Sequence, residues 1–420
     1  MKPAVIVLGA GMVGVCTALH LRQRGHEVTL IDRREPGRET SYGNAGIIQR
    51  EAVEPYAFPR DWAMLARVAM KRGADVNYHL GALPALAGPL GRYWWNSRPA
   101  SHRRIARDYA RLIEHCLSEH DALIEQAGAQ ELVRREGYRF VFRETASMRE
   151  GVANARRLAD ECGVGHAVLD SDALAQAEPA LRRRLAGAIH WLDPWTVNDP
   201  GELVARYAAL LRQAGGRVLQ GDAATLRATG AGEGRGKGTA WRVRTAEGDV
   251  EAPHAVVALG PWSDGLLRTL GYRYPLFVKR GYHRHYTGGE PPRLPMLDAD
   301  GGLVIVPMRQ GVRITTGAEF ARLDAPPTPV QVPRAHALAS ELLDLPQAVE
   351  PQPWMGARPC TADMLPVIGA APRHPGLWFN FGHAHQGFTL GPVSGRLLAE
   401  LIGGEAPVVE PLPYSPARYG

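Results

Sequence analysis

The feature that most constrains the fold is a glycine pattern near the N-terminus, Gly9-x-Gly11-x-x-Gly14. It lies between the apolar run "AVIVL" and a helical segment that stops near Gly25, and "EVTLI" follows as a second strand. In this strand–helix–strand context the first glycine permits a tight turn and the second lets a pyrophosphate approach the backbone. The third lets helix and strand pack closely. The pattern therefore predicts a dinucleotide-binding Rossmann unit.

Residues beside these glycines extend the predicted site. Met12 and Val13 open the helix, whose N-terminal N–H groups and partial positive charge suit phosphates. Asp32 closes the second strand, where it is placed to accept hydrogen bonds from a ribose. Arg33 and Arg34 follow, and two interpretations stay open for them: contact with the 2′-phosphate of NADP, or a solvated strand end.

Composition narrows the class of protein. A chain of 420 residues with 45% hydrophobic and 22% charged residues predicts a soluble globular protein of two domains. The net charge of +6 suggests an anionic ligand or weak attraction to anionic surfaces, and does not by itself imply nucleic acid. The four cysteines are widely separated and form no CxxC pair, which fits a reducing cytoplasm. The uncharged run from Ala4 to Leu21 contains three glycines, so we interpret it as strand and helix and not as a signal peptide.

Further along the chain, apolar periodicity predicts one amphipathic helix over Ser101–Ala127 and a strand at "YRFVFR". Asp199 and Pro200 predict the start of a helix that ends at Gly215–Gly216. The glycine-rich stretch 230–238 lacks a preceding strand, and we expect a flexible hairpin loop there. The region 272–320 is predicted to be mainly β, and "LWFNF" is predicted as a strand before a final helix ending near Gly403.

Five ordered motifs carry a resemblance to a known family. They are the N-terminal glycine pattern, "TSYGNAG", "VVALGPWS", "GARPCTADMLPVIG" and "GHAHQGFTLGP". Together they span nearly the whole chain, and they resemble the FAD-dependent D-amino-acid oxidase superfamily, most of all its bacterial D-amino-acid dehydrogenases, including those acting on 4-hydroxy-D-proline. The resemblance implies an α/β, doubly wound, Rossmann-like FAD domain (1–75, 188–262 and 351–420). A mixed-sheet α+β substrate domain (76–187 and 263–350) would be inserted into it.

The resemblance also implies noncovalent FAD, because relatives that attach flavin through cysteine do not do so at a position matching Cys360. Small residues of the "TSYGNAG" loop and of the later motifs would lie along the cofactor, with a plain turn as the alternative for that loop. The cofactor-binding residues expected beyond the N-terminal unit are Ser41, Asn44, Ala45, Gly46, Ala224, Gly260, Trp262, Gly382, Gln386, Gly387 and Thr389.

Arg358 is the strongest candidate for substrate binding. It stands among apolar residues in "WMGARPCT", where an unpaired buried charge is costly. A substrate carboxylate would satisfy it through a bidentate pair, and the matching arginine of the family anchors that carboxylate. The alternative is an internal ion pair, for example with Asp363.

His383 and His385 are expected to line the same cavity. The position matching His385 is a cationic substrate contact in some relatives. For His383, a purely structural role stays open as the alternative. His283, His285 and His374 offer no spacing that specifies a metal site, so we expect no metal.

Tyr282 and Tyr286 would share one face of a strand in the substrate domain, with His283 and His285 on the other face. Relatives place a tyrosine from this region over the flavin, and core packing is the alternative. Glu319 is a further cavity candidate of lower rank.

Together these expectations predict an enzyme that oxidises a D-amino or D-imino acid by hydride transfer from Cα to flavin N5. 4-Hydroxy-D-proline or D-proline is the favoured substrate. The electron acceptor stays open among a quinone, an electron-transfer partner and O2. No nucleic-acid partner is expected. The expected location is the cytoplasm, and peripheral association with the inner face of the cytoplasmic membrane and a homodimer both stay open. A glycine- or sarcosine-type oxidase, a tRNA-modifying FAD protein and a non-enzymatic flavin-binding subunit are the competing functions.

Overall fold

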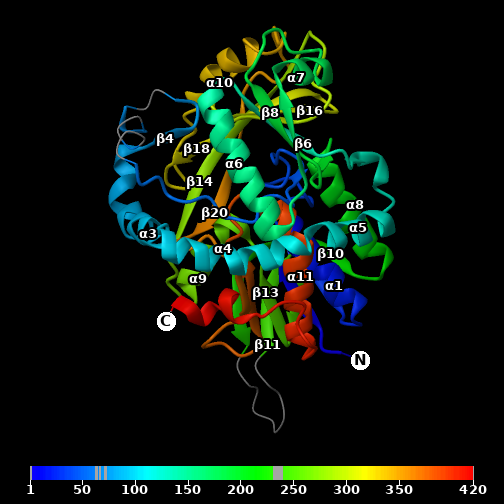
Figure 1. Cartoon of the computed structure of the whole chain (residues 1–420). Helices are drawn as coiled ribbons and strands as arrows, with labels where there is room; N and C mark the ends of the chain where they lie inside the picture. Colours follow the sequence, from blue (N-terminus) through cyan, green and yellow to red (C-terminus); the bar gives the residue numbers. More distant parts are fainter. Residues whose placement is uncertain (1, 62–64, 66–67, 71–72, 230–239, 420) are drawn as a thin grey trace.

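A computed structural model gives the structure of the chain at residues 2–61, 65, 68–70, 73–229 and 240–419. Two large sheets dominate it (Figure 1). The stretch 230–238, expected to be a hairpin loop, lies outside the described residues. Within the described ranges, every helix is too short or too polar to span a bilayer.

The first sheet has eight strands in the order β12-β11-β10-β2-β1-β13-β22-β21. Its central five strands pair in parallel, as the N-terminal strand–helix–strand pattern predicted. The strands are β1 (Val5–Leu8), β2 (Val28–Asp32), β10 (Arg217–Thr229), β11 (Ala240–Thr245), β12 (Gly248–Ala252), β13 (His254–Val257), β21 (Val367–Ala370) and β22 (Leu377–Phe381). All four residues of β1 are buried because helices or loops cover both faces of a parallel sheet.

Helices α1 (Met12–Gln23), α8 (Pro200–Gln213) and α11 (Gly387–Gly403) pack together on one face of this sheet. Helix α9 (Ser263–Thr269) belongs to the core on the other face. The predicted start of α8 is confirmed, because the Asp199 carboxylate accepts a hydrogen bond from the Glu202 N–H at 3.0 Å. The final helix ends at Gly403 as predicted, with Gly404 in the left-handed region.

The second sheet has eleven strands, with β4-β18-β14-β17-β16-β15-β6-β8-β7 in order and β19 and β20 paired to β14. They are β4 (Val76–Tyr78), β6 (Tyr138–Phe142), β7 (His166–Asp170), β8 (Gly187–Trp191), β14 (Leu276–Thr287), β15 (Met296–Asp298), β16 (Leu303–Met308), β17 (Gly311–Thr315), β18 (Ala318–Phe320), β19 (Gln347–Ala348) and β20 (Trp354–Thr361). Helices α6 (Thr145–Cys162), α7 (Ser171–Ala177) and α10 (Gln331–Ser340) pack on it.

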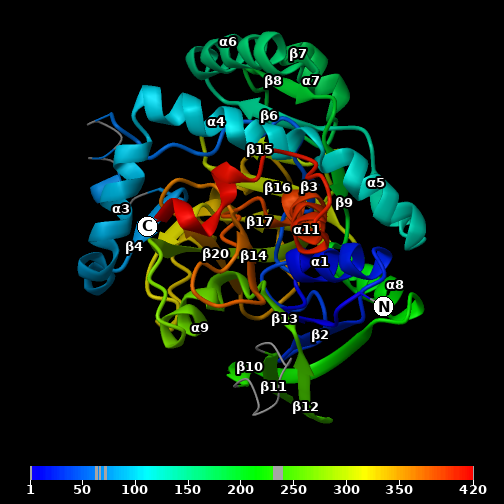
Figure 2. The ribbon, with the colours of Figure 1, turned by 90° about the horizontal axis from the view of Figure 1, so that it is seen from below.

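A small sheet of β3 (Ile47–Ile48), β9 (Trp195–Val197) and β5 (Val133–Arg134) lies beside these two. Figure 2 shows α3 (Leu83–Asn96) at the periphery and α4 (Pro99–Glu114) crossing the molecule toward α5 (Cys116–Gln126). The 3-10 turns are η1 (Leu80–Ala82), η2 (Gln130–Leu132), η3 (Gly260–Trp262), η4 (Leu412–Tyr414) and η5 (Pro416–Tyr419).

Two expectations about organisation need correction. The single helix expected over 101–127 is two helices, α4 and α5, which meet at His115. Both keep a buried apolar face, so the apolar periodicity continues across a bend that no glycine or proline marks. The domain boundaries also shift, because β8 and β20 were assigned to the FAD domain but pair within the second sheet.

Candidate active site

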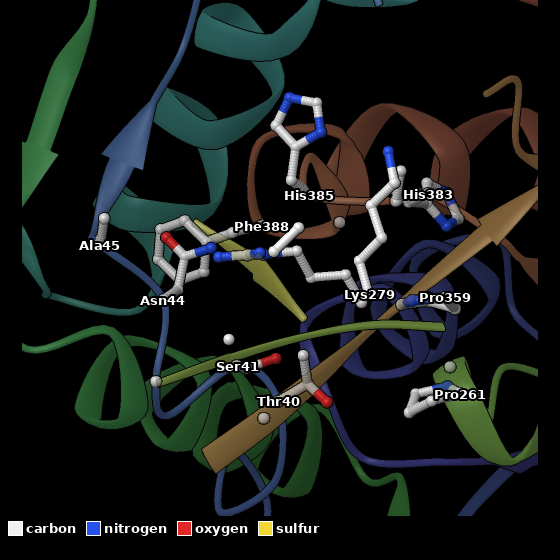
Figure 3. Close-up of a pocket in the computed structure, with 18 of the residues that line it drawn as sticks. Thr40, Ser41, Asn44, Ala45, Pro261, Lys279, Pro359, His383, His385 and Phe388 are labelled. Carbon is white, nitrogen blue, oxygen red and sulfur yellow. The ribbon is translucent and has the colours of Figure 1, made fainter. Parts of the chain in front are cut away.

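A cavity of about 970 Å³ is lined by residues of both large sheets (Figure 3). Most of the residues expected from the sequence lie on its wall. They are Gly9, Gly11, Met12, Val13, Asp32, Arg33, Ser41, Asn44, Ala45, Ala224, Gly260, Trp262, Tyr282, Arg358, Gly382, His383, His385 and Gly387.

The glycines at the end of β1 form a close-packed turn. Gly9 has φ +107°, and a Cβ added there would lie 2.4 Å from the Ala258 carbonyl oxygen. A Cβ on Gly14 would lie 1.8 Å from the Gly9 carbonyl oxygen, so Gly14 serves helix–strand packing and does not line the cavity. Gly11 differs, because its added Cβ would meet only the Ser41 hydroxyl, at 3.3 Å. Gly11 is therefore the glycine whose missing side chain leaves space for a ligand.

Asp32 is held at the end of β2 by two backbone donors. Its carboxylate accepts hydrogen bonds from Ala10 N–H at 2.6 Å and Arg34 N–H at 3.0 Å. The Arg33 guanidinium donates to Glu39 at 2.7 Å and lies 4.2 Å from the centre of the Trp262 ring. Because Arg33 is already paired, it is a poorer partner for an additional phosphate than a free arginine would be.

The loop after β2 contributes Ser41, Asn44 and Ala45 to the cavity (Figure 3). The Ser41 hydroxyl accepts a hydrogen bond from Met12 N–H at 3.0 Å, which ties this loop to the start of α1. Gly46 is turned away: its N–H donates to the Asn44 side chain, and its added Cβ would lie 2.1 Å from the Val197 carbonyl oxygen. Gly46 therefore serves the packing of the loop and does not contact a ligand in the cavity.

At the start of α11, Gly382 and Gly387 line the cavity, but Gln386 and Thr389 do not. The Gln386 amide donates to the Gln49 side chain at 2.7 Å, and the Thr389 hydroxyl accepts from Gln49 N–H at 3.2 Å. Both residues therefore fasten α11 to the segment after β3 and support the cavity wall from behind.

The alternative of an Arg358–Asp363 ion pair is wrong. Asp363 pairs with Arg418 at 2.9 Å, whereas the Arg358 guanidinium donates to the backbone carbonyl of Gly317 at 2.9 Å and lies 3.5 Å from that of Thr316. Among the residues that the structure describes, no carboxylate forms an ion pair with Arg358. Burial lowers the pKa of Arg358. A charge placed this way in a cavity is suited to bind an anionic group.

Both histidines of "GHAHQG" are held neutral. Burial lowers the pKa of His383 to about 3, and Nε2 of this side chain has no hydrogen-bond partner in the described part of the chain. Burial, together with Arg358 and Lys279, lowers the pKa of His385 to about 3, and its ring centre lies 4.6 Å from that of Tyr56. A cationic His385 near neutral pH, expected from the resemblance, is therefore not supported.

We expect His385→Ala to change kcat/KM by about two- to tenfold, the effect of one ordinary hydrogen bond, while FAD stays bound. Because the pKa of His385 is about 3, the substitution should leave the pH profile of kcat/KM unchanged between pH 5 and 8. The measurement is steady-state kinetics across that range for both proteins. A titration near pH 6 that disappears in the variant would contradict the neutral assignment.

Within the described residues, one group of potential metal ligands lies outside the cavity, formed by His283, His285 and Glu350. Both ring nitrogens of His285 are already engaged: Nδ1 pairs with Glu350, and Nε2 accepts a hydrogen bond from Arg313 at 3.0 Å. The Arg313 side chain also donates to the Tyr42 and Asn44 carbonyls. This network fastens the cavity loop to the second sheet, and its guanidinium would repel a cation.

The two tyrosines of β14 have different surroundings. Tyr282 lines the cavity, and its hydroxyl donates to Glu319 at 2.7 Å and accepts from Thr328 N–H at 2.9 Å. Tyr286 lies outside the cavity wall and stacks on His336 of α10, with ring centres 4.2 Å apart. Four residues along a strand span about 13 Å, so a shared strand face does not imply a shared site. Glu319 is fully buried against Arg280 and does not line the cavity.

Sequence reasoning missed the wall contributed by Tyr56, Phe58, Tyr93 and Lys279. Lys279 carried one usable signal, because it and Arg280 are charged residues that directly follow the apolar run "PLFV" in a predicted strand. The other three lie outside the five motifs, and only folding brings Tyr93 together with Tyr56 and Phe58 at the cavity. Cys360 is buried and does not line the cavity.

The Rossmann sheet, the glycine turn and the carboxylate at the end of β2 define a dinucleotide-binding protein. Residues 4–401 match the family described as "FAD dependent oxidoreductase". The chain is 32% identical to a D-amino-acid oxidase of Bradyrhizobium diazoefficiens, with 99% of this chain and 98% of the relative covered. It is 30% identical to a D-amino acid dehydrogenase of Chromohalobacter salexigens, with 99% of each covered.

Among solved structures, a glycine oxidase from Geobacillus kaustophilus shares the fold with a TM-score of 0.72 at 21% identity, covering 99% of this chain and 98% of that one. The chain therefore belongs to the DAO family of FAD-dependent oxidoreductases, and its cofactor is FAD. The expected Rossmann-like FAD-binding fold and the enzyme class are both confirmed. The open Gly11 and the anchored Asp32 fit a dinucleotide at this end of the cavity.

Proposed function

We propose that the protein is an FAD-dependent dehydrogenase of D-amino or D-imino acids, with 4-hydroxy-D-proline or D-proline as favoured substrates. The observation that carries the proposal is Arg358, a cavity guanidinium without a carboxylate partner among the described residues. The relatives from Bradyrhizobium diazoefficiens and Chromohalobacter salexigens, both named for D-amino acids, support the substrate class. The preference for a proline-type ring rests on the overall resemblance of the sequence motifs.

In this proposal Arg358 holds the substrate carboxylate through a bidentate pair and so fixes the orientation of the Cα–H bond. When bound, FAD supplies the acceptor for the hydride that leaves Cα. The neutral imidazoles of His383 and His385 shape the wall, and neither is protonated near pH 7. Gly382 and Gly387, just before and at the start of α11, line the part of the cavity where the cofactor would lie.

The experiment that tests this function is anaerobic reduction of the purified holoprotein by matched D- and L-amino acids. Bleaching of the flavin absorbance by D-proline or 4-hydroxy-D-proline, and not by the L-enantiomers, is the expected result. Reduction by glycine or sarcosine alone would favour the competing amine oxidase. Absence of bleaching by any amino acid would overturn the proposal.

The tRNA alternative has no structural observation in its favour. Its densest basic cluster, the three arginines at 182–184, is engaged in ion pairs with acidic side chains at 2.7–3.3 Å. These pairs are Arg182–Asp344, Arg183–Glu341 and Arg184–Asp172.

The electron acceptor is a second part of the proposal, and it rests on an exposed apolar surface that we call the α3 patch. Five large side chains of the segment around α3 are exposed there: Met70, Leu80, Leu83, Trp94 and Trp95. Helix α3 has no acidic residue, and Arg60 and Arg98 lie 4.0 and 3.4 Å from the Trp94 and Trp95 ring centres. Tryptophan with arginine is typical of surfaces that lie on anionic lipid.

We therefore propose that the α3 patch lies on an anionic membrane and that a membrane quinone is the acceptor. Tyr93 of the same helix lines the cavity, so docking there would bring the substrate site close to the lipid. Figures 1 and 2 both place α3 at the outer edge of the molecule, where a flat surface can reach it.

The double variant Trp94→Ser/Trp95→Ser should weaken co-sedimentation with phosphatidylglycerol vesicles at least tenfold, because burial of each large side chain contributes about 1.5–3 kcal/mol. A matched control is Val168→Ser/Leu192→Ser, which removes two exposed side chains from another face. Equal loss in both variants, or undiminished vesicle binding in the tryptophan variant, would exclude the α3 patch as the docking surface.

A further inference from the structure

A second unpaired cation, Lys279, faces the cavity beside Arg358. The two residues are direct partners in the antiparallel pairing of β14 and β20, and both line the cavity. Like charges directly opposite each other on a sheet are destabilising. In the part of the chain that the structure describes, neither forms an ion pair with an acidic side chain, so no carboxylate there offsets this repulsion.

The surroundings of Lys279 commit only part of its hydrogen-bonding capacity. Its ammonium donates to the Tyr93 hydroxyl at 3.1 Å and lies 4.4 Å from the centre of that ring. The Tyr93 hydroxyl in turn donates to the Tyr56 carbonyl at 2.6 Å, so its own proton is already used. An ammonium has three N–H donors, and two of them have no partner in the described residues.

The two cations are held by different elements. Lys279 reaches toward α3, and in Figure 3 its amine extends to the side of the cavity where His385 and His383 lie. Arg358 is held by the backbone at 316–317, between β17 and β18. Burial lowers the pKa of Lys279, and Arg358 lowers it further, while Cys360 acts in the opposite direction. An anion placed at Lys279 would relieve both the desolvation and the repulsion.

We propose that Lys279, with Tyr93 and His385, forms a second subsite for an oxygen acceptor on the substrate side chain, with a carboxylate as the strongest ligand. This inference rests on the proposed function, in which Arg358 takes the α-carboxylate. One carboxylate facing two cations leaves a positive excess, whereas a side-chain carboxylate removes it. The hydroxyl of 4-hydroxy-D-proline belongs to the same class as a weaker acceptor, and D-proline has no such group.

Binding of unreactive acids tests the subsite without turnover. Isothermal titration of the FAD-loaded protein should give a Kd for glutarate about ten- to a hundredfold lower than for butyrate, the range for one hydrogen bond to a charged group. Lys279→Met should remove this difference, and Lys279→Arg should restore part of it. A ratio near one in the unmodified protein would overturn the subsite, whatever the variants do.

Kinetics test the same subsite against substrates. The ratio of kcat/KM for 4-hydroxy-D-proline over D-proline, and for D-glutamate over D-norvaline, should exceed one and fall toward one in Lys279→Met. Lys2→Met is the control, because Lys2 is exposed and pairs with Glu405 far along the chain. If the protein oxidises D-amino acids with ratios that Lys279→Met leaves unchanged, the subsite is wrong and the proposed function stands. If no amino acid reduces the flavin, the proposed function itself fails.

Discussion

Arg358→Lys should lower kcat/KM for a D-amino acid roughly 30- to 5000-fold while FAD stays bound. This corresponds to a loss of about 2–5 kcal/mol of transition-state stabilisation. A lysine ammonium keeps the charge but cannot make two parallel hydrogen bonds to a carboxylate. KM should rise and kcat should fall, because the carboxylate contact both binds the substrate and orients Cα–H. The measurement is steady-state kinetics together with the flavin spectrum of the purified variant.

Arg284→Lys is the matched control for this experiment. Arg284 lies on β14, is half-buried, and donates to a backbone carbonyl at 2.6 Å, as Arg358 does at 2.9 Å, but it does not line the cavity. Its substitution should leave kcat/KM within about twofold, since a contact outside the cavity has no differential effect on the reacting substrate. Equal losses in both variants would assign Arg358 a structural role.

Gly11→Leu should weaken FAD binding roughly a hundredfold, because filling a close-packed contact costs up to about 3 kcal/mol. Gly11 is informative because its backbone is compatible with any residue, and an added Cβ meets only the Ser41 hydroxyl at 3.3 Å. The chain should therefore fold and purify colourless. FAD content after acid release and the circular dichroism spectrum measure the two effects separately.

Two other glycines mark the limits of this prediction. Gly14→Ala should destabilise the protein even without cofactor, since its Cβ would lie 1.8 Å from the Gly9 carbonyl oxygen. Gly88→Leu should change neither FAD binding nor the stability of the protein, because Gly88 of α3 has open space around it. A yellow, fully loaded Gly11→Leu protein would contradict the placement of the cofactor against this turn.

The N-terminal unit illustrates what sequence reasoning achieves. The glycine spacing, the apolar strands and Asp32 are local features, and they led directly to the parallel strands β1 and β2 and the turn between them. The Asp199 cap and the end of α11 are also local, and both are confirmed. Chain-local signals succeed where the hydrogen-bond partner lies within a few residues.

Tyr286 and the expected single helix over 101–127 show where such signals stop. Alternation assigned Tyr286 to a strand face, but α10 covers that end of β14 and takes the ring. Apolar periodicity continued through His115, although the chain bends there. Both outcomes depend on which element packs where, and the periodicity of one segment contains no information about its neighbours.

The amino-acid sequence by itself determined the dinucleotide-binding unit and the family, and it singled out Arg358 as a candidate, because each depends on residue types at fixed spacings. Only the tertiary structure decided that Asp363 pairs with Arg418, which leaves Arg358 without a carboxylate partner among the described residues, and that Lys279 stands directly opposite Arg358. It also decided that burial keeps His385 neutral. Charge pairing and desolvation depend on distances between residues remote in the chain, and these distances exist only once the two sheets have packed together.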